Sequence, residues 1–244
     1  MYFIASKYEE KNLNNHAYGY KDTGIIKMTG IGRYDGLINN DQKQILITPT
    51  WRMYNAMPVT TSEGEQRSYN PDFKNTVYYR IYNDLINNQK LIETAKRTGY
   101  KIKYLLHPIL SAQVDDYTPD PYVDVISSVG DMSYEKILTE SSLMVTDYSG
   151  VQFDFAYMKK RLMYYQFDYD DFRRGQYAEG YFSYEKDGFG RVCYTQEEAI
   201  SEIEKAVKEQ FVNPGMYRQR HDSFFDLCDD RNCERTYNTI KERC

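Results

Sequence analysis

The stretch that decides the fold is Leu-Met-Val-Thr-Asp-Tyr-Ser-Gly-Val-Gln-Phe-Asp-Phe-Ala, residues 143–156. Its apolar start predicts a buried strand, residues 147–150 predict a tight turn, and the sequence from Val151 predicts a helix. This order points the free N–H groups of the helix N-terminus past the strand end. The arrangement favours a bound phosphate, although Asp and Ser before a helix are also ordinary N-caps.

The rest of the chain alternates predicted strands with predicted helices. Strands are expected near residues 45–48, 101–106, 123–126, 143–146, 161–167 and 190–194. Helices are expected near residues 77–98, 133–141, 150–160 and 196–210, and from about 214 and about 232. Strands alternating with helices imply right-handed crossovers and a mostly parallel sheet. We therefore predict an α/β fold with a Rossmann-like parallel sheet.

Local signals refine this pattern. The predicted helix 77–98 is either one helix or two helices broken near residues 87–88, and Gly99 ends it in the C′ position. Thr195 and Glu198 form a capping box. Residues 53–76 are predicted to be a long loop, and a Tyr-, Asp- and Gly-rich stretch follows Asp168.

We expect three parts along the chain. Residues 1–40 hold two short strand-like pieces, which is too little for a core, so they indicate the tail of a preceding lobe or a crossover segment. Residues 41–212 are predicted to form the nucleotide-binding domain. Residues 213–244 are predicted to be C-terminal helices.

Composition excludes several functions. The net charge of −5 over 244 residues argues against nucleic-acid binding, which needs clustered Lys and Arg. No apolar run approaches the roughly 20 residues of a membrane span, and the start lacks a signal-peptide pattern. The chain is therefore predicted to be cytoplasmic. The four Cys have no metal-ligand spacing, so we expect reduced thiols and no metal site.

Polar residues follow three of the predicted strands. In a parallel sheet, ligands bind beyond the carboxyl ends of the strands, so these residues are site candidates. Each also has a purely structural interpretation: Arg52 as an ion-pair partner, His107 as a core histidine, Asp154 as part of a polar helix face. The candidates are Thr50, Arg52, His107, Asp147, Ser149, Gly150 and Asp154.

At these positions the chain resembles the CDP-glycerol glycerophosphotransferase family of teichoic-acid and capsule polymerases. Four motifs carry the resemblance in the family's order, over residues 1 to about 205. They are Thr-Gly-Ile-Gly-Arg-Tyr-Asp at 29–35, Pro-Thr-Trp-Arg at 49–52, His-Pro at 107–108 and Thr-Asp-Tyr-Ser-Gly-Val-Gln-Phe-Asp-Phe-Ala at 146–156. The resemblance implies the C-terminal donor lobe of a GT-B fold.

The family's functional Arg, His, second Ser and later Asp fall on Arg52, His107, Gly150 and Asp154. A polymer-end hydroxyl would attack the donor's β-phosphate and release CMP. Arg52 would bind the diphosphate in a bidentate manner, and His107 would be the catalytic residue that donates to it. Thr50, Asp147 and Ser149 complete the predicted substrate-binding set. No cofactor is expected, and side chains would supply the positive charge.

Two departures from the family pattern matter. Gly150 replaces the second Ser and so removes a hydroxyl. Residues 1–40 can supply only the tail of the N-terminal lobe, through which family members bind the polymer acceptor and provide a second essential His; His16 is the one upstream candidate. The resemblance implies CDP-glycerol or a related CDP-polyol as donor and work at the inner face of the membrane, through peripheral association.

Two alternatives stay open. The chain could be a nucleotide-binding module without activity of its own. It could also be a nucleotide-sugar glycosyltransferase or epimerase of similar fold.

Overall fold

A six-stranded parallel sheet forms the centre of the computed structural model, which describes residues 1–15, 18–59 and 67–242. The strand order is β5-β4-β3-β6-β7-β8, and every neighbouring pair is parallel. The strands are β3 (Gln44–Ile47), β4 (Lys101–Leu105), β5 (Val123–Ile126), β6 (Ser141–Thr146), β7 (Arg161–Tyr165) and β8 (Gly190–Cys193). The predicted Rossmann-like α/β sheet is therefore confirmed.

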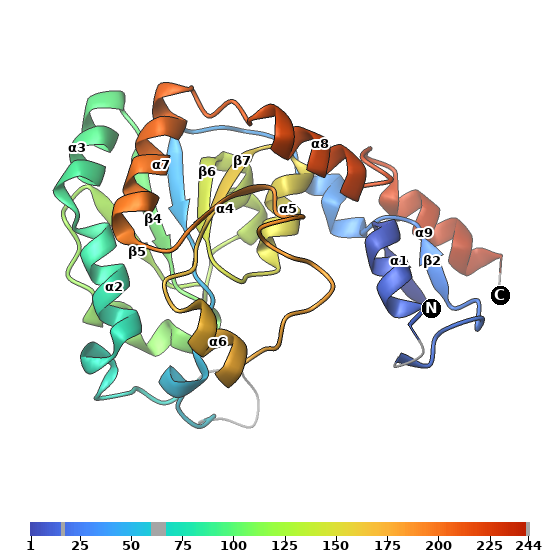
Figure 1. Cartoon of the computed structure of the whole chain (residues 1–244), viewed down its shortest axis with the longest axis horizontal. Coiled ribbons are helices and arrows are strands. Elements are labelled where there is room, and N and C mark those ends of the chain that lie inside the picture. The colour runs from blue at the N-terminus through green and yellow to red at the C-terminus, as the bar shows by residue number, and fades with distance from the viewer. Residues whose placement is uncertain (16–17, 60–66, 243–244) are drawn as a thin grey trace.

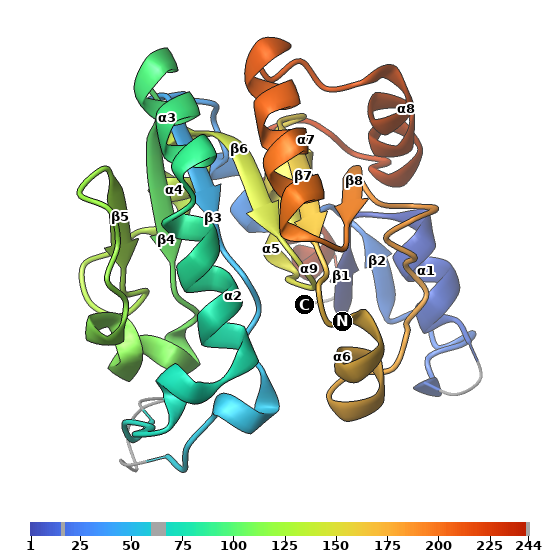
Figure 2. The same ribbon diagram turned by 60° about the vertical axis from the view of Figure 1, so that its left-hand side comes forward.

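Helices cover both faces of this sheet (Figures 1 and 2). One face carries α2 (Val77–Ile86), α3 (Gln89–Thr98) and α7 (Gln196–Lys208), and the other carries α4 (Tyr134–Glu140), α5 (Val151–Tyr157) and α8 (Gly215–Phe224). Successive strand residues point to opposite faces. Accordingly, Ile45 and Ile47 lie in the core under α2, α3 and α7, whereas Leu46 lies in the core under α4 and α5.

A small separate sheet lies at the far end of the molecule (Figure 1). It pairs β1 (Tyr2–Ile4) with β2 (Ile26–Met28), with α1 (Lys7–Leu13) between them. The last helix, α9 (Asn232–Lys241), packs beside this segment. The expected division at residues 40 and 212 stays a prediction, and His16 and Cys244 lie outside the described residues.

Asp35 joins α9 to the N-terminal segment. Its carboxylate accepts hydrogen bonds from the backbone N–H groups of Asn232 at 2.9 Å and Cys233 at 2.7 Å, at the start of the helix. Gly30 has a φ of +76°, and a Cβ there would lie 1.7 Å from Asn232 Oδ1. The motif at residues 29–35 therefore has a packing role: it needs glycine for the close approach and Asp35 for the cap.

The structure refines several predicted elements. The helix near residues 77–98 is two helices, and Asn88 caps the second with its side chain. The helix after β6 ends at Tyr157, earlier than predicted, and Lys159 lies in the left-handed region at a φ of 58°. The capping box of Thr195 and Glu198 is present as predicted. The polar stretch after Asp168 contains an unpredicted helix, α6 (Tyr169–Gly175).

Lys160 is buried and directly precedes β7. Its Nζ donates to the backbone oxygens of Thr139 at 2.5 Å, Ser141 at 2.7 Å and Leu138 at 3.3 Å. These oxygens lie at the C-terminal end of α4, where helical carbonyls have no partner within the helix. Lys160 thus satisfies the end of α4 and ties it to β7.

We predict that Lys160→Met lowers the free energy of unfolding by about 1–3 kcal/mol, because three buried carbonyl oxygens lose a charged hydrogen-bond donor. Urea denaturation at neutral pH measures this. Lys159→Met, at the exposed neighbouring position, is the matched control and should change stability little. Equal stability of both variants would contradict the proposed role of Lys160.

Candidate functional site

The strand order reverses direction between β3 and β6. The chain moves outward from β3 through β4 to β5, and then returns to the centre at β6. Ligands in open α/β sheets bind beyond the carboxyl ends of the strands at such a switch point. The motifs at 49–52 and 146–150 follow these two central strands, so the structure places both at the switch point.

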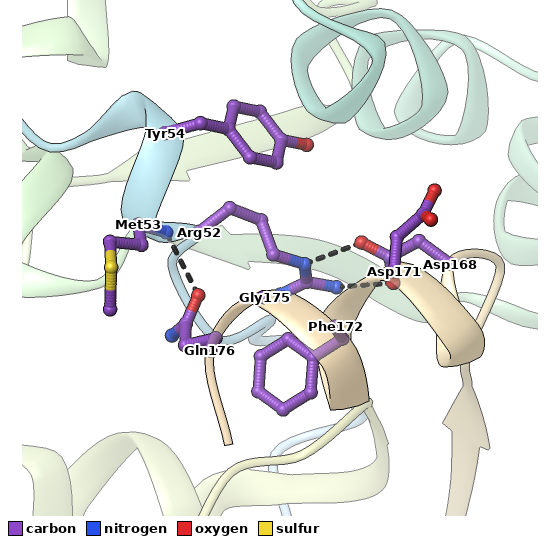
Figure 3. Close-up of a pocket in the computed structure, with 8 residues that line it drawn as sticks. All are labelled: Arg52, Met53, Tyr54, Asp168, Asp171, Phe172, Gly175 and Gln176. Atoms are coloured by element: carbon purple, nitrogen blue, oxygen red, sulfur yellow. Dashed lines mark hydrogen bonds and ion pairs between the residues drawn. The ribbon is translucent and has the colours of Figure 1, made fainter. Parts of the chain in front are cut away.

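Arg52 lies at the centre of this edge and is 1% exposed. Its Nε donates to Asp168 Oδ2 at 2.6 Å and its Nη2 to Asp168 Oδ1 at 2.9 Å, as Figure 3 shows. The same Nη2 lies 2.9 Å from Asp147 Oδ2, and Nη1 donates to the backbone oxygen of Thr50 at 2.6 Å. All three guanidinium nitrogens therefore have protein partners.

Asp147 is fully buried and joins β3 to β6. Its Oδ1 accepts from the backbone N–H of Thr50 at 2.8 Å and from that of Tyr148 at 2.5 Å, and its Oδ2 accepts from the Tyr82 hydroxyl at 3.3 Å. Burial opposes the charge on Arg52, but Asp147 and then Asp168 more than offset this and raise the pKa of Arg52 well above its usual value. The guanidinium therefore stays charged.

Aromatic rings surround the same cluster. Tyr148 stacks on Phe172 with ring centroids 3.8 Å apart and planes at 8°. The Arg52 guanidinium carbon lies 5.2 Å from the Tyr148 centroid and 4.9 Å from that of Phe172. Burial, followed by the charges of Asp168 and Asp147, raises the pKa of the Tyr148 hydroxyl, so it is a neutral donor at physiological pH.

A cavity of about 350 Å³ opens beside Arg52, between the segment after β3 and helix α6 (Figure 3). Gln176 bridges its rim, because its Oε1 accepts from the Met53 N–H at 2.8 Å and its Nε2 donates to the Trp51 oxygen at 3.1 Å. The lining residues are Arg52, Met53, Tyr54, Asp168, Asp171, Phe172, Gly175 and Gln176. Its size suits a small ligand.

His107 follows β4 and lies at the same edge of the sheet, where its ring is close to that of Trp51. The two ring centroids lie 6.2 Å apart. His107 Nδ1 accepts from the Ile109 N–H at 3.3 Å, which fixes the ring at the start of the next segment. The side chain is partly exposed, so the structure places the imidazole beside the motif of β3.

Ser149 and Gly150 form the turn into α5. Ser149 Oγ accepts from the Val151 N–H at 3.3 Å, and Gly150 is exposed. Asp154, in the first turn of α5, pairs with Arg33 at 2.6 and 2.9 Å through both carboxylate oxygens. The structure therefore gives Asp154 an ion-pair partner from the N-terminal segment.

The buried hydroxyl of Thr50 has no hydrogen-bond partner within the described part of the chain. A buried polar group without a partner costs stability, and a ligand often satisfies such a group. The structure thus brings Thr50, Arg52 and Asp147 into direct contact, and His107 joins them through Trp51. Substrate contacts for these residues stay predictions.

Sequence reasoning missed Asp168, which is central to the cluster. Asp168 follows β7 closely, so the strand-end rule that selected Arg52 and His107 applies to it as well. It also missed the stacking partners Tyr148 and Phe172. Nothing in the polar sequence after β7 indicates that helix α6 brings Phe172 and Arg173 back to this edge.

Among residues 1–15, 18–59 and 67–242, no group of three or more His, Cys, Asp and Glu side chains could hold a metal ion. The three Cys within these ranges are free thiols. The helices there are all too short or too polar to cross a membrane.

Comparison with solved structures supports the fold. The chain superposes on the wall teichoic acid polymerase TagF with a TM-score of 0.69 and 18% identity, covering 99% of this chain and 57% of that chain. A second TagF structure, of the H444N variant soaked with CDPG, gives a TM-score of 0.64 and 18% identity, covering 98% of this chain and 55% of that one. These likenesses confirm the expected GT-B type of fold.

Sequence comparison gives the family. The chain is 36% identical over 239 residues to the minor teichoic acid biosynthesis protein GgaB of Bacillus subtilis, and the match covers 98% of this chain and 26% of that protein. The chain thus spans about a quarter of that relative's length. Residues 1–242 match the family described as CDP-Glycerol:Poly(glycerophosphate) glycerophosphotransferase, and the chain belongs to this family.

Proposed function

We propose that this chain is the donor-binding lobe of a CDP-glycerol-dependent glycerophosphotransferase. The reaction would transfer glycerol phosphate, or a related polyol phosphate, from a CDP-activated donor to a growing teichoic-acid or capsular polymer. Family membership supports the reaction class. The observation that carries the proposal is the meeting of the motifs after β3 and β6 at the switch point, around Asp147.

In the proposed reaction, a polymer-end hydroxyl forms a bond to the donor's β-phosphorus. The bond from that phosphorus to the bridging oxygen breaks, CMP leaves with the electron pair, and the hydroxyl proton passes to a base. Such chemistry depends mainly on positioning and on N–H groups that face the developing charge. We assign the N–H groups near Ser149 and Gly150, and the imidazole of His107, to this task.

Arg52 can act on the donor either by direct contact or by holding the site together. Its nitrogens already bond Asp147, Asp168 and Thr50, so a direct bond to a diphosphate would require exchange of one of these partners. Without exchange, Arg52 supports donor binding by holding the ends of β3, β6 and β7 together. Asp154 is proposed to hold a hydroxyl of the donor or of its ribose. Because Arg33 already bonds both carboxylate oxygens of Asp154, this contact would also require exchange of a partner.

The acceptor polymer and peripheral membrane association belong to the proposal as well. Flotation with anionic lipid vesicles tests the association. Recovery of the chain in the lipid-free fraction would contradict it.

Arg52→Ala should lower CDP-glycerol affinity at least tenfold, equivalent to about 1.4 kcal/mol, because Asp147 and Asp168 lose their shared cation. The same loss destabilises the fold by about 3–5 kcal/mol, so circular dichroism must establish that the variant is folded. Arg52→Lys keeps the charge and serves as the second variant. Unchanged calorimetric affinity in a folded variant would refute the assignment.

A Cβ at Gly150 would meet no atom of the described residues within 4 Å, and φ is −65°, so serine fits. Gly150→Ser should leave the melting temperature unchanged and strengthen CDP-glycerol binding about fivefold, the value of one added hydrogen bond. Gly150→Ala adds the Cβ without the hydroxyl and is the control. Equal affinity for both variants would place this position away from the donor.

As a donor-binding lobe, the chain incubated with labelled CDP-glycerol and a lipoteichoic primer should bind the donor and release no CMP by itself. CMP release would instead identify a complete transferase. A thermal-shift comparison of CDP-glycerol, CDP-ribitol and UDP-sugars defines the donor, because a bound ligand raises the melting temperature. A shift with UDP-sugars alone would favour a glycosyltransferase or epimerase.

A further inference from the structure

The proposed donor carries a diphosphate, so its site needs a cation with N–H groups to offer. Arg52 is buried at the right edge, but each of its nitrogens already bonds an oxygen of the protein. Arg33, in the N-terminal segment, bonds both oxygens of Asp154. A different side chain is therefore needed to contact the phosphates without breaking an existing bond.

Arg173, on helix α6, has the required free N–H groups. Its Nε is buried and has no hydrogen-bond partner in the structure. Its Nη1 donates to the backbone oxygen of Ala178 at 3.2 Å, and this is its one hydrogen bond among the described residues. A guanidinium has five N–H donors, so most of the hydrogen-bonding capacity of Arg173 is unused.

Aromatic rings hold this guanidinium in place. Its central carbon lies 5.4 Å from the ring centroids of Tyr148 and Tyr169, 5.6 Å from that of Tyr184 and 5.9 Å from that of Phe172. Ring faces attract the cation but accept no strong hydrogen bond from its N–H groups. The rings therefore position Arg173 while leaving its donors available.

The position of Arg173 fits the proposed donor site. Tyr148 belongs to the motif after β6 and directly precedes Ser149, and Arg173 lies against the ring of Tyr148. Thr50 adds a second buried group without a partner, its hydroxyl, and its backbone bonds Asp147 next to Tyr148. The Thr50 hydroxyl and the Arg173 guanidinium, which come from different elements, thus both carry unpartnered polar atoms near the motif after β6.

Two other arginines are weaker candidates. Arg174 is exposed and pairs with Asp171 at 2.8 Å. Arg67 also has a buried Nε without a partner, but it adjoins residues 60–66, which lie outside the described part of the chain. Among the residues that the structure describes, neither has a contact that connects it to the motif after β6.

We propose that Arg173 is a phosphate-binding residue of this site, whose unused N–H groups contact the diphosphate of the nucleotide donor. The inference rests on the proposed function for the identity of the donor. It assigns the phosphate contact to a residue outside the four motifs, and it leaves Arg52 in its structural ion pairs.

Isothermal titration calorimetry of four proteins tests the proposal: the wild type, Arg173→Ala, Arg173→Gln and Arg97→Ala. Arg173→Gln keeps most of the side-chain stem and a planar amide against the rings but loses the charge. Arg97→Ala makes the same charge change as Arg173→Ala at an exposed site in the last turn of α3. Each protein is titrated with CDP-glycerol, CDP and inorganic pyrophosphate, after its melting temperature has been measured.

We expect both Arg173 variants to bind CDP-glycerol and CDP at least tenfold more weakly than the wild type, and Arg97→Ala to bind as the wild type does. An Arg173→Gln variant that melts at the wild-type temperature and binds CDP within twofold of the wild type would overturn the inference.

Pyrophosphate separates the two possible failures. Pyrophosphate binding that depends on Arg173, in a wild type that binds neither CDP-glycerol nor CDP, would refute the proposed function but support the phosphate contact. Pyrophosphate binding that is equal in all four proteins would refute the phosphate contact. Failure of the wild type to bind any of the three probes would reject both.

Discussion

The buried pairing of one guanidinium with two carboxylates is the constraint on which this edge of the sheet depends. Arg52, Asp147 and Asp168 follow three different strands, β3, β6 and β7. Charged groups taken out of water must find partners of opposite charge or hydrogen bonds. Because each of these groups satisfies another, none of the three strand ends can move without leaving a buried charge unpaired.

The cluster carries one more negative charge than positive. Hydrogen bonds compensate for the excess on Asp147, which accepts from two backbone N–H groups and the Tyr82 hydroxyl. These donors are fixed by the backbone after β3 and β6, so the sheet itself stabilises the carboxylate. Because Arg52 is already paired with both carboxylates, an anionic ligand would draw on cations outside the cluster, such as Arg173.

The sequence predicts the parallel sheet well, because its apolar runs are short and alternate with helical segments, and Pro ends the runs of β3 and β4. The same strand-end logic selects Arg52 and His107 as site candidates from the sequence alone. Helix α6 escaped prediction because only Phe172 in it is buried, so the sequence shows no apolar stripe at helical spacing. The pairing of Arg52 with Asp168 was equally invisible, since it depends on which strand lies beside β6.

The cap that Asp35 provides for α9 has a consequence for how the chain is made. Asp35 and Asn232 are 197 positions apart. Synthesis proceeds from the N-terminus, and early segments emerge long before late ones. The first small sheet therefore leaves the ribosome well ahead of the helix that completes its surroundings, and its final packing must wait for the synthesis of α9. Contacts between such distant segments slow the folding of a domain, so this closure is expected to be a late event in biogenesis.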